Sequence, residues 1–240
     1  MKNLRKYAFF LVACGLSIPN PMLTAHAAGQ AAASQQPEPV VGEAATVPAA
    51  DSQAAAEPTG EVAEAAPEAI GRLNAALIDI MQRADGLGYG GRFEVVAPVV
   101  SDLFDIPFMA AKSIGGYWRK LNGEERRRWV KTFEVYMVSN FADRFDGFSG
   151  ESFEIVGEKP ASRETLMVQT RLNRPGEDAV DLDYRMREEE RGWKVVDIYS
   201  DGKISEVALR RSEYSAVLKR GGIEQLIAAV DAKTKKRAGK

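Results

Sequence analysis

The sequence contains almost no cysteine or histidine. Its 240 residues include one of each, Cys14 and His26. A single cysteine cannot form an internal disulfide, and a single histidine cannot build a zinc site from His and Cys ligands. Cys–His and Ser–His catalysis both need an imidazole, so the fate of His26 decides whether either mechanism is open to the protein.

Net charge is also low. The 32 Lys and Arg residues nearly balance the 34 Asp and Glu residues, which gives a formal net charge of −2 at pH 7. Proteins that bind nucleic acid carry a basic excess that neutralises phosphates. We therefore expect no nucleic-acid partner. The hydrophobic content of 45% and the charged content of 28% are typical of a soluble globular protein.

The first 27 residues have the pattern of a secretory signal peptide. Three basic residues precede an apolar stretch at 7–18, and an A-x-A cleavage site lies at 25–27. The apolar stretch is shorter than the about 20 residues that span a bilayer. Cleavage after residue 27 would remove Cys14 and His26 together. The expected mature chain then has no thiol, no imidazole and no metal site built from either.

Cys14 also supports a second interpretation. Residues 11–15, Leu-Val-Ala-Cys-Gly, resemble a lipobox, in which the cysteine becomes a lipidated N-terminus. The apolar stretch continues beyond Cys14, and a good A-x-A site follows it. Cleavage at residue 27 is therefore favoured over lipoprotein anchoring.

Residues 28–67 differ in composition from the rest of the chain. They contain fourteen Ala, five Pro and six acidic residues, but no basic and no aromatic residue. This composition, without an amphipathic period, is typical of a disordered linker. The expected folded unit is a single domain at 68–240, where 29 basic residues face 28 acidic ones.

The first half of this domain has helical periodicity. Apolar residues recur every three or four positions over 70–81, and 93–103 forms a second helical segment. The glycine-rich stretch 86–91 is expected to be a loop between them. Asp105 is expected to cap a third helix that begins near residues 106–107.

A long helix is expected after Asn122, because Asn122 and Glu125 have the spacing of a capping box. This helix has a broad face rich in aromatic residues: Trp129, Phe133, Tyr136, Met137, Asn140, Phe141, Arg144, Phe145 and Phe148.

The second half of the domain alternates with a period of two. Strands are expected at 153–155, 166–172, 180–186 and 193–199, separated by short turns. Such a meander has one apolar face and one solvated face. Val195 and Val196 disagree in parity, so the faces of the last strand stay unassigned.

Helices are expected again after the strands. Ser205 can cap one that ends at Gly221-Gly222, and a last short helix follows. The predicted fold class is α+β, with a four-stranded antiparallel sheet wrapped by N- and C-terminal helices around an apolar cavity.

The candidate ligand-binding residues are the apolar side chains that would face one another across this cavity. Periodicity cannot distinguish a filled core from a hollow one, but an apolar cavity is the usual form of a small-molecule site. The candidates are Phe104, Phe108, Trp118, Phe133, Tyr136, Met137, Phe141, Leu166, Val168, Leu182, Tyr184 and Met186.

Two charged patterns have a functional and a structural interpretation. Asp181 and Asp183 share one face of a strand and could form an acid/base pair. A solvated face is favoured, because the alternate residues of that strand are apolar. The Arg126-Arg127-Arg128 run is expected to be a solvated helix face, with a docking patch for an acidic partner or lipid headgroup as the alternative.

Several of these segments, in this order and spacing, resemble a known family. They are Phe104-Asp105-Ile106-Pro107-Phe108, Gly115-Gly116-Tyr117-Trp118-Arg119 and Glu125-Arg126-Arg127 with Trp129, Phe133 and Tyr136. Together they resemble the MlaC (toluene-tolerance) family of periplasmic lipid-binding proteins. Residues of the C-terminal part resemble the hopanoid-associated HpnM branch of this family more closely, namely 193–202, 204–208, 210–214 and 221–222. The resemblance covers about 68–231.

The resemblance implies a lipid held between sheet and helices, with no catalysis. We also expect no cofactor and no metal. The resemblance also implies a soluble periplasmic carrier that moves phospholipid or hopanoid between the inner and outer membranes and supports outer-membrane lipid asymmetry. The implied partners are an inner-membrane transporter component and an outer-membrane acceptor.

Two other functions stay open. One is an envelope interaction module with a filled core, tethered through Cys14. The other is a small-pocket isomerase or hydrolase that uses an acid or base such as Asp197 or Tyr184, by analogy of fold alone. A strongly raised pKa of a carboxylate buried in the pocket would favour the enzyme.

Overall fold

The computed structural model describes residues 64–239, so the predicted signal peptide, Cys14 and nearly all of the predicted linker lie outside the described residues. The elements are α1 (Ala66–Gln82), α2 (Ala84–Leu103), α3 (Ile106–Ile114), the 3-10 helix η1 (Gly115–Lys120), α4 (Gly123–Arg144), β1 (Ser152–Ala161), β2 (Thr165–Asn173), β3 (Val180–Glu189), β4 (Gly192–Ser200), β5 (Ile204–Ser205) and α5 (Glu206–Ala238). Within residues 64–239, no helix combines the length and apolar character that crossing a bilayer requires.

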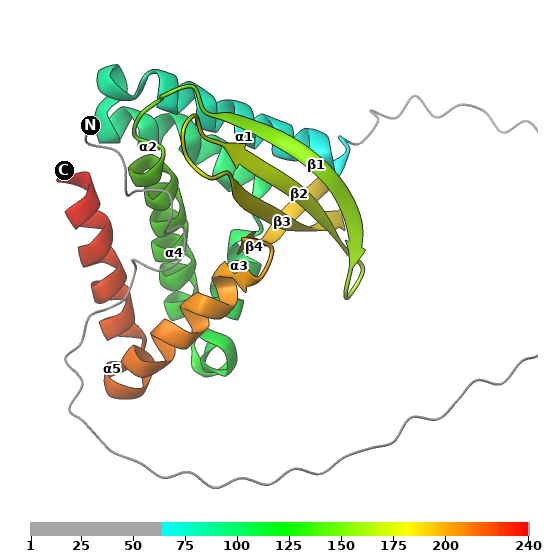
Figure 1. Cartoon of the computed structure of the whole chain (residues 1–240). Coiled ribbons are helices and arrows are strands. Elements are labelled where there is room, and N and C mark those ends of the chain that lie inside the picture. The colour runs from blue at the N-terminus through cyan, green and yellow to red at the C-terminus, as the bar shows by residue number, and fades with distance from the viewer. Residues whose placement is uncertain (1–63, 240) are drawn as a thin grey trace, which may run out of the picture. The chain divides into compact units, whose positions relative to one another are not determined.

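The strands form one antiparallel sheet whose spatial order, β1-β2-β3-β4-β5, follows the chain (Figure 1). The α+β class is confirmed, but the prediction of four strands was wrong. The fifth strand consists of Ile204 and Ser205, which pair with Ser200 and Tyr199. Two residues are too few to show a period of two, so sequence reasoning assigned them to the following helix.

A β-bulge in β4 explains the parity of its two valines. Arg185 is paired with Asp197 and Met186 with Val195, so Val196 is an extra residue in β4. Both valines are buried. A bulge re-aims the side chains around it, which lets neighbouring apolar residues both find buried positions.

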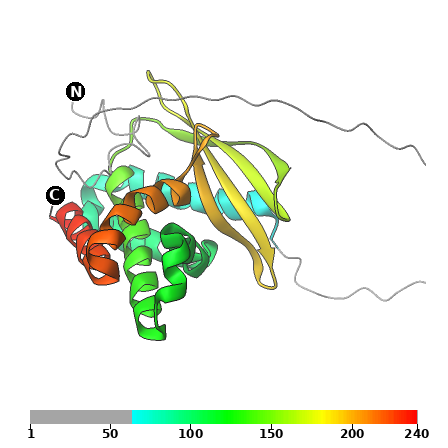
Figure 2. The same ribbon diagram turned by 90° about the horizontal axis from the view of Figure 1, so that it is seen from below.

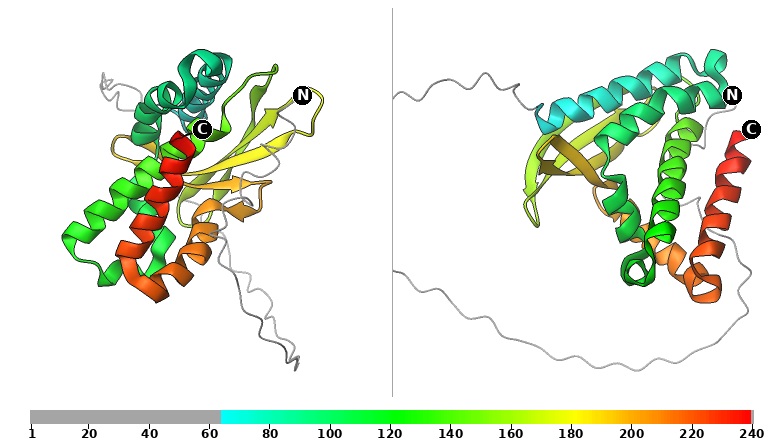
Figure 3. Two further views of the ribbon diagram at one scale, coloured as in Figure 1. Left: turned by 90° about the vertical axis from the view of Figure 1, so that its left-hand side faces the viewer. Right: turned by 180° about the vertical axis from the view of Figure 1, so that it is seen from behind.

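Figures 1, 2 and 3 show the sheet as a twisted layer with the helices beside it. Helix α1 runs along the sheet, and the C-terminal half of α5 lies next to α4. One apolar core joins the two layers and contains the predicted stripe of α1 and most of the aromatic face of α4. Phe148 is the exception, because α4 ends at Arg144 and the Phe148 side chain is 42% exposed.

The predicted helix caps are confirmed. The Asp105 carboxylate accepts a hydrogen bond from the Phe108 amide at 3.0 Å, and the Ser205 hydroxyl accepts one from the Ala208 amide at 3.0 Å. Asn122 and Glu125 form a reciprocal capping box with distances of 2.9 and 2.8 Å. Each cap satisfies amides that the first helical turn leaves free.

The glycine-rich stretch 86–91 is helical rather than a loop. The break is confined to Gly88, whose φ of 57° and ψ of −172° separate two helical segments of α2. The buried Arg92 side chain bridges this break. Its guanidinium donates to the Ala84 carbonyl at 3.0 Å and to the Ala142 carbonyl on α4 at 2.9 Å. Tertiary packing thus keeps helical a segment whose composition predicts a turn.

Helix α5 bends sharply at the predicted Gly221-Gly222 position. Gly222 has a φ of 67°, and a Cβ there would lie 3.1 Å from the Tyr117 hydroxyl of η1. Glycine therefore allows both the left-handed backbone and the close approach of η1.

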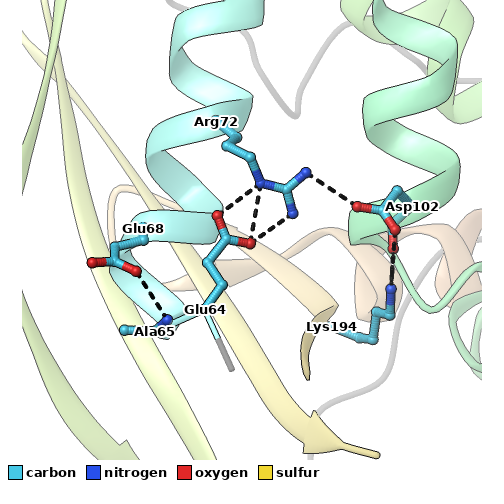
Figure 4. A network of polar contacts seen from close by, with 6 residues as sticks. All are labelled: Glu64, Ala65, Glu68, Arg72, Asp102 and Lys194. Atoms are coloured by element: carbon cyan, nitrogen blue, oxygen red, sulfur yellow. Dashed lines mark hydrogen bonds and ion pairs between the residues drawn. The ribbon is translucent and has the colours of Figure 1, made fainter. Parts of the chain in front are cut away.

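Charged residues connect the start of α1 to the end of α2 and to β4 (Figure 4). Arg72 bonds to Glu64 at 2.8 Å and to Asp102 at 3.2 Å, while Lys194 donates to the Asp102 carbonyl. Arg72 and Asp102 are about half exposed, so the ion pairs that they form contribute little to stability. Helix α1 begins at Ala66, two residues before the expected domain start at residue 68.

Strand β1 is the outer strand of the sheet at the end away from β5. Most of its side chains are exposed, including Ile155 and Val156. Its pairing with β2 shifts register between Ile155 and Gly157.

Candidate functional site

Most of the candidate ligand-binding residues lie in the packed core between sheet and helices. Nine of the twelve candidate residues are at most 3% exposed and pack into the core: Phe104, Phe133, Tyr136, Met137, Phe141, Val168, Leu182, Tyr184 and Met186. The void between Met137, Phe141 and Ile198 measures about 10 Å³, roughly the space for a single water. The structure brings these residues together as a packed core, and their role in ligand binding stays a prediction.

The other three candidates, Phe108, Trp118 and Leu166, are partly buried at the border of the core. The Trp118 ring packs beneath the Arg126 guanidinium, 5.2 Å from its centroid. Phe108 lines a larger pocket.

This pocket has a volume of about 430 Å³ and lies on the opposite face of the sheet. Arg185 and Arg187 line it, and they alternate along β3 with Tyr184 and Met186, which face the core. Its other walls come from α3, the β1–β2 turn, β4 and the first turns of α5. The site therefore lies where sequence alternation predicted a solvated face.

Part of the pocket wall is apolar. Phe108, Val196, Val207 and Ala208 line it, and Val196 is the extra residue of the β4 bulge. A volume of about 430 Å³ is in the range of pockets that enclose drug-sized molecules. A lipid with two acyl chains is larger, so it could not be enclosed whole without movement of the surrounding elements.

The rest of the wall is strongly basic. Five of the twelve lining residues are cations, namely Lys112, Arg163, Arg185, Arg187 and Arg211, against the single carboxylate of Asp197. The domain as a whole is nearly neutral. Arg187 is neutralised by ion pairs with Asp105 and Glu189, both at 2.6 Å. The other four cations form no ion pair with any residue of 64–239.

Arg185 is held in place by neutral oxygens. Its guanidinium donates to the Thr165 hydroxyl at 2.8 Å and to the carbonyl and hydroxyl of Ser162 at 2.5 and 3.0 Å. These bonds orient the side chain without cancelling its charge. An anion that enters the pocket would meet a positioned guanidinium.

Arg211 is positioned by the absence of a side chain at Gly115. A Cβ on Gly115 would lie 2.8 Å from the Arg211 Nε atom, and Gly115 has a φ of 56°. The start of η1 thus gives the Arg211 guanidinium room beside the pocket. Two segments that carry the family resemblance, 115–119 and 210–214, meet here in space.

Asp197 is the buried carboxylate in the pocket wall. Burial raises its pKa above the ordinary value. Its Oδ2 atom accepts a bond from the Ser205 hydroxyl at 2.5 Å, and its Oδ1 atom accepts bonds from the Ile198 and Val207 amides at 2.9 and 3.1 Å. The raised pKa meets one criterion for an enzyme. The three bonds, however, use both oxygens to join β4 to the start of α5.

Tyr184, the other residue considered for an enzyme, lies on the core side of β3. Burial raises its pKa, and its hydroxyl has no hydrogen-bond partner within the described chain. Tyr184 and Asp197 therefore do not share a site.

The two aspartates of β3 differ in environment. Asp181 forms an ion pair with Arg171 at 2.8 Å and is partly exposed, as a solvated face would require. The solvated face was wrong for Asp183, which is 5% exposed and has a raised pKa because of burial. The turn at Gly202 covers it, since a Cβ there would lie 3.5 Å from Asp183 Oδ2.

The arginine run of α4 is partly structural. Arg128 forms a bidentate ion pair with Glu224 of α5, with both distances 2.7 Å. Arg126 covers Trp118, as described above. These contacts join α4 to α5 and η1, and the ion pair of Arg128 reduces the charge that this run could offer a partner.

The pocket cations were not among the residues selected from the sequence. Lys112, Arg163, Arg185 and Arg211 come from four separate elements, and no local spacing connects them. The available signal was the strict alternation of Arg185 and Arg187 with apolar residues on β3. Such alternation indicates a solvated face, because the apolar residues mark the core side.

The antiparallel sheet, the apolar core that joins it to the helices and the basic pocket on its polar face together define an α+β domain. The family model described as "MlaC protein" matches residues 72–232, about two thirds of the chain. The chain therefore belongs to the MlaC family.

A solved structure has a similar fold. It is a phospholipid-binding protein from Ralstonia solanacearum, in complex with a phospholipid. The two share 21% identity with a TM-score of 0.61 over 72% of this chain and 96% of the other. No curated protein matches the chain.

Proposed function

We propose that this protein is a lipid-binding carrier. The observation that carries the proposal is its membership of the MlaC family together with a pocket that joins an apolar wall to a basic one. Such a pocket suits an amphiphile with acyl chains and a polar headgroup. The phospholipid-binding relative from Ralstonia solanacearum has the same fold and supports the same ligand class.

The acyl chains would enter from the pocket into the adjacent core. The pocket alone is too small for two chains, and the apolar candidates lie on the other side of the sheet and beside α3. A movement of α3 and the first turns of α5 away from β4 would connect the two spaces at Phe104 and Phe108.

The energetics suit a carrier. Each buried CH₂ group contributes about 0.8 kcal/mol relative to water. Relative to a bilayer the gain is close to zero, because the chain is already in hydrocarbon. The protein can therefore hold a lipid against loss to water and still exchange it with membranes. Partners must set the direction of transfer.

The site of action is proposed to be the periplasm, reached through the signal peptide at 1–27. The cargo would be phospholipid or, as the likeness to the HpnM branch suggests, hopanoid. Transfer would run between the inner and outer membranes, with an inner-membrane transporter component and an outer-membrane acceptor as partners. A binding role is favoured over catalysis, because the buried carboxylate of the pocket is engaged in capping α5.

Native mass spectrometry of the gently purified full chain, followed by lipid extraction, tests the proposal. We expect one bound lipid per chain, and its mass distinguishes phospholipid from hopanoid. Intact-mass analysis of the same sample shows whether Cys14 is lipidated. A ligand-free protein, purified without detergent, would contradict the carrier and favour the tethered interaction module.

A further inference from the structure

We propose that the pocket selects lipids whose headgroup carries a net negative charge, through Lys112, Arg163, Arg185 and Arg211. This inference rests on the proposed function and narrows its ligand class. It assigns the headgroup to the basic wall and the acyl chains to the apolar wall.

The first argument is the local excess of charge. Apart from Arg187, which Asp105 and Glu189 neutralise, a nearly neutral domain places four cations and the carboxylate of Asp197 around one pocket of about 430 Å³. Like charges that converge repel one another, so their accumulation in one cavity has a cost in the absence of an anion. A phosphate-bearing headgroup would remove this repulsion.

The second argument is that the four proposed cations are not neutralised within residues 64–239. Arg187 has Asp105 and Glu189 as partners, whereas Arg185 is held by the oxygens of Ser162 and Thr165. A guanidinium fixed by neutral acceptors keeps its charge and loses little freedom when an anion binds. Arg185 is thus prepared for a phosphate oxygen.

The third argument is that the cations line the same pocket as the apolar wall. Lys112 lies on α3 with its Nζ atom 5.0 Å from the centre of the Phe108 ring, and Arg211 lines the same pocket from α5. Arg163 lies in the β1–β2 turn beside Arg185. A headgroup bound among them would leave its acyl chains beside Phe108.

The Lys112→Gln/Arg211→Gln double variant tests the selection. Both residues are exposed on helices, and glutamine is compatible with a helix, so folding should be retained. The matched control is Lys219→Gln/Arg220→Gln, which removes the same charge from an exposed part of α5 outside the pocket.

The probes are dihexanoylphosphatidylglycerol, dihexanoylphosphatidylcholine and inorganic phosphate, each titrated as a monomeric solution by calorimetry. Short-chain monomers avoid attraction to a charged vesicle surface. We expect the unmodified protein and the control variant to bind the anionic phosphatidylglycerol about tenfold more tightly than the zwitterionic phosphatidylcholine, as charge-assisted bonds would give. The pocket variant should lose this preference for phosphatidylglycerol and still bind phosphatidylcholine.

Three other results would overturn the inference. Equal affinity for the two lipids in the unmodified protein would reject selection by charge while leaving the carrier intact. Inorganic phosphate bound as tightly as phosphatidylglycerol would show an anion site that is independent of lipid. Failure to bind either lipid would reject the proposed function together with the inference.

Discussion

The two faces of the sheet use their space differently, although the same strands supply both. Toward the helices, Val168, Tyr184 and Ile198 lie side by side across three strands and are buried in the hydrophobic core. On the other face, Arg185 and Asp197 line an open pocket. Neighbouring residues of β3 thus serve different purposes: one stabilises the fold, and the next is available to a ligand.

The largest expected effect on stability comes from substituting Tyr184 of β3, and its neighbour Arg185 provides the contrast. Tyr184→Ala removes a fully buried aromatic ring and should lower the free energy of unfolding by about 3 to 5 kcal/mol. Arg185→Gln should change it by much less and weaken binding of the anionic lipid instead. Urea denaturation and calorimetry of both variants test this, and similar loss of stability in the two would remove the distinction between the faces.

A smaller effect is expected at the pocket edge, from Gly115→Ala. The left-handed backbone of Gly115 should cost about 1 to 2 kcal/mol with any side chain, and the new Cβ would displace Arg211. Gly71→Ala in α1 is the control, since a Cβ there meets no atom within 4 Å. It should stabilise the protein by about 0.5 to 1 kcal/mol. Thermal unfolding of both variants shows whether the two signs differ.

The core face should tolerate loss of the Tyr184 hydroxyl. This group is buried without a hydrogen-bond partner among the described residues. Tyr184→Phe keeps the ring and removes the unpaired group, so the free energy of unfolding should stay equal or rise by about 1 kcal/mol. A loss of stability in urea denaturation would indicate that the hydroxyl has a partner, such as a buried water.

The smallest expected effect concerns the pH dependence of stability at Asp197. Its pKa is raised in the folded protein, so folding favours the protonated form. The free energy of unfolding should then be greatest below the unfolded pKa, about 4, and fall as pH rises through the folded pKa. Asp197→Asn should reduce this decline, because an amide does not titrate and can still accept and donate the capping bonds.

The control for that experiment is Asp178→Asn at an exposed position, which should leave the decline unchanged. Asp183 also has a raised pKa and would account for the decline that remains in the Asp197 variant. An unchanged profile in Asp197→Asn would show that Asp197 does not contribute.

The parts of the fold that depend on local pattern could be predicted from the sequence. The stripe of α1, the caps at Asp105, Asn122 and Ser205, and the break at Gly221-Gly222 each require only neighbouring residues. The residues that form each of these features lie within one or two helical turns of one another, so a local sequence pattern is enough to predict them.

The parts that depend on tertiary contacts could not be predicted. The helical state of 86–91 relies on bonds from Arg92 to two distant carbonyls, and the β4 bulge appears only when β4 is paired with β3. The pocket depends even more on tertiary contacts. Its cations come from four elements, and only the packing of α3 and α5 against the polar face of the sheet turns a solvated surface into a site.

The irregular pairing of β1 bears on how this protein behaves at high concentration. An outer strand with exposed apolar residues can pair with the same strand of another molecule and start aggregation. In β1, the register shift after Ile155 twists the strand, Pro160 offers no amide to a partner, and Glu154, Glu158 and Lys159 place charge along it. We therefore expect the domain to remain monodisperse in spite of its exposed Ile155 and Val156.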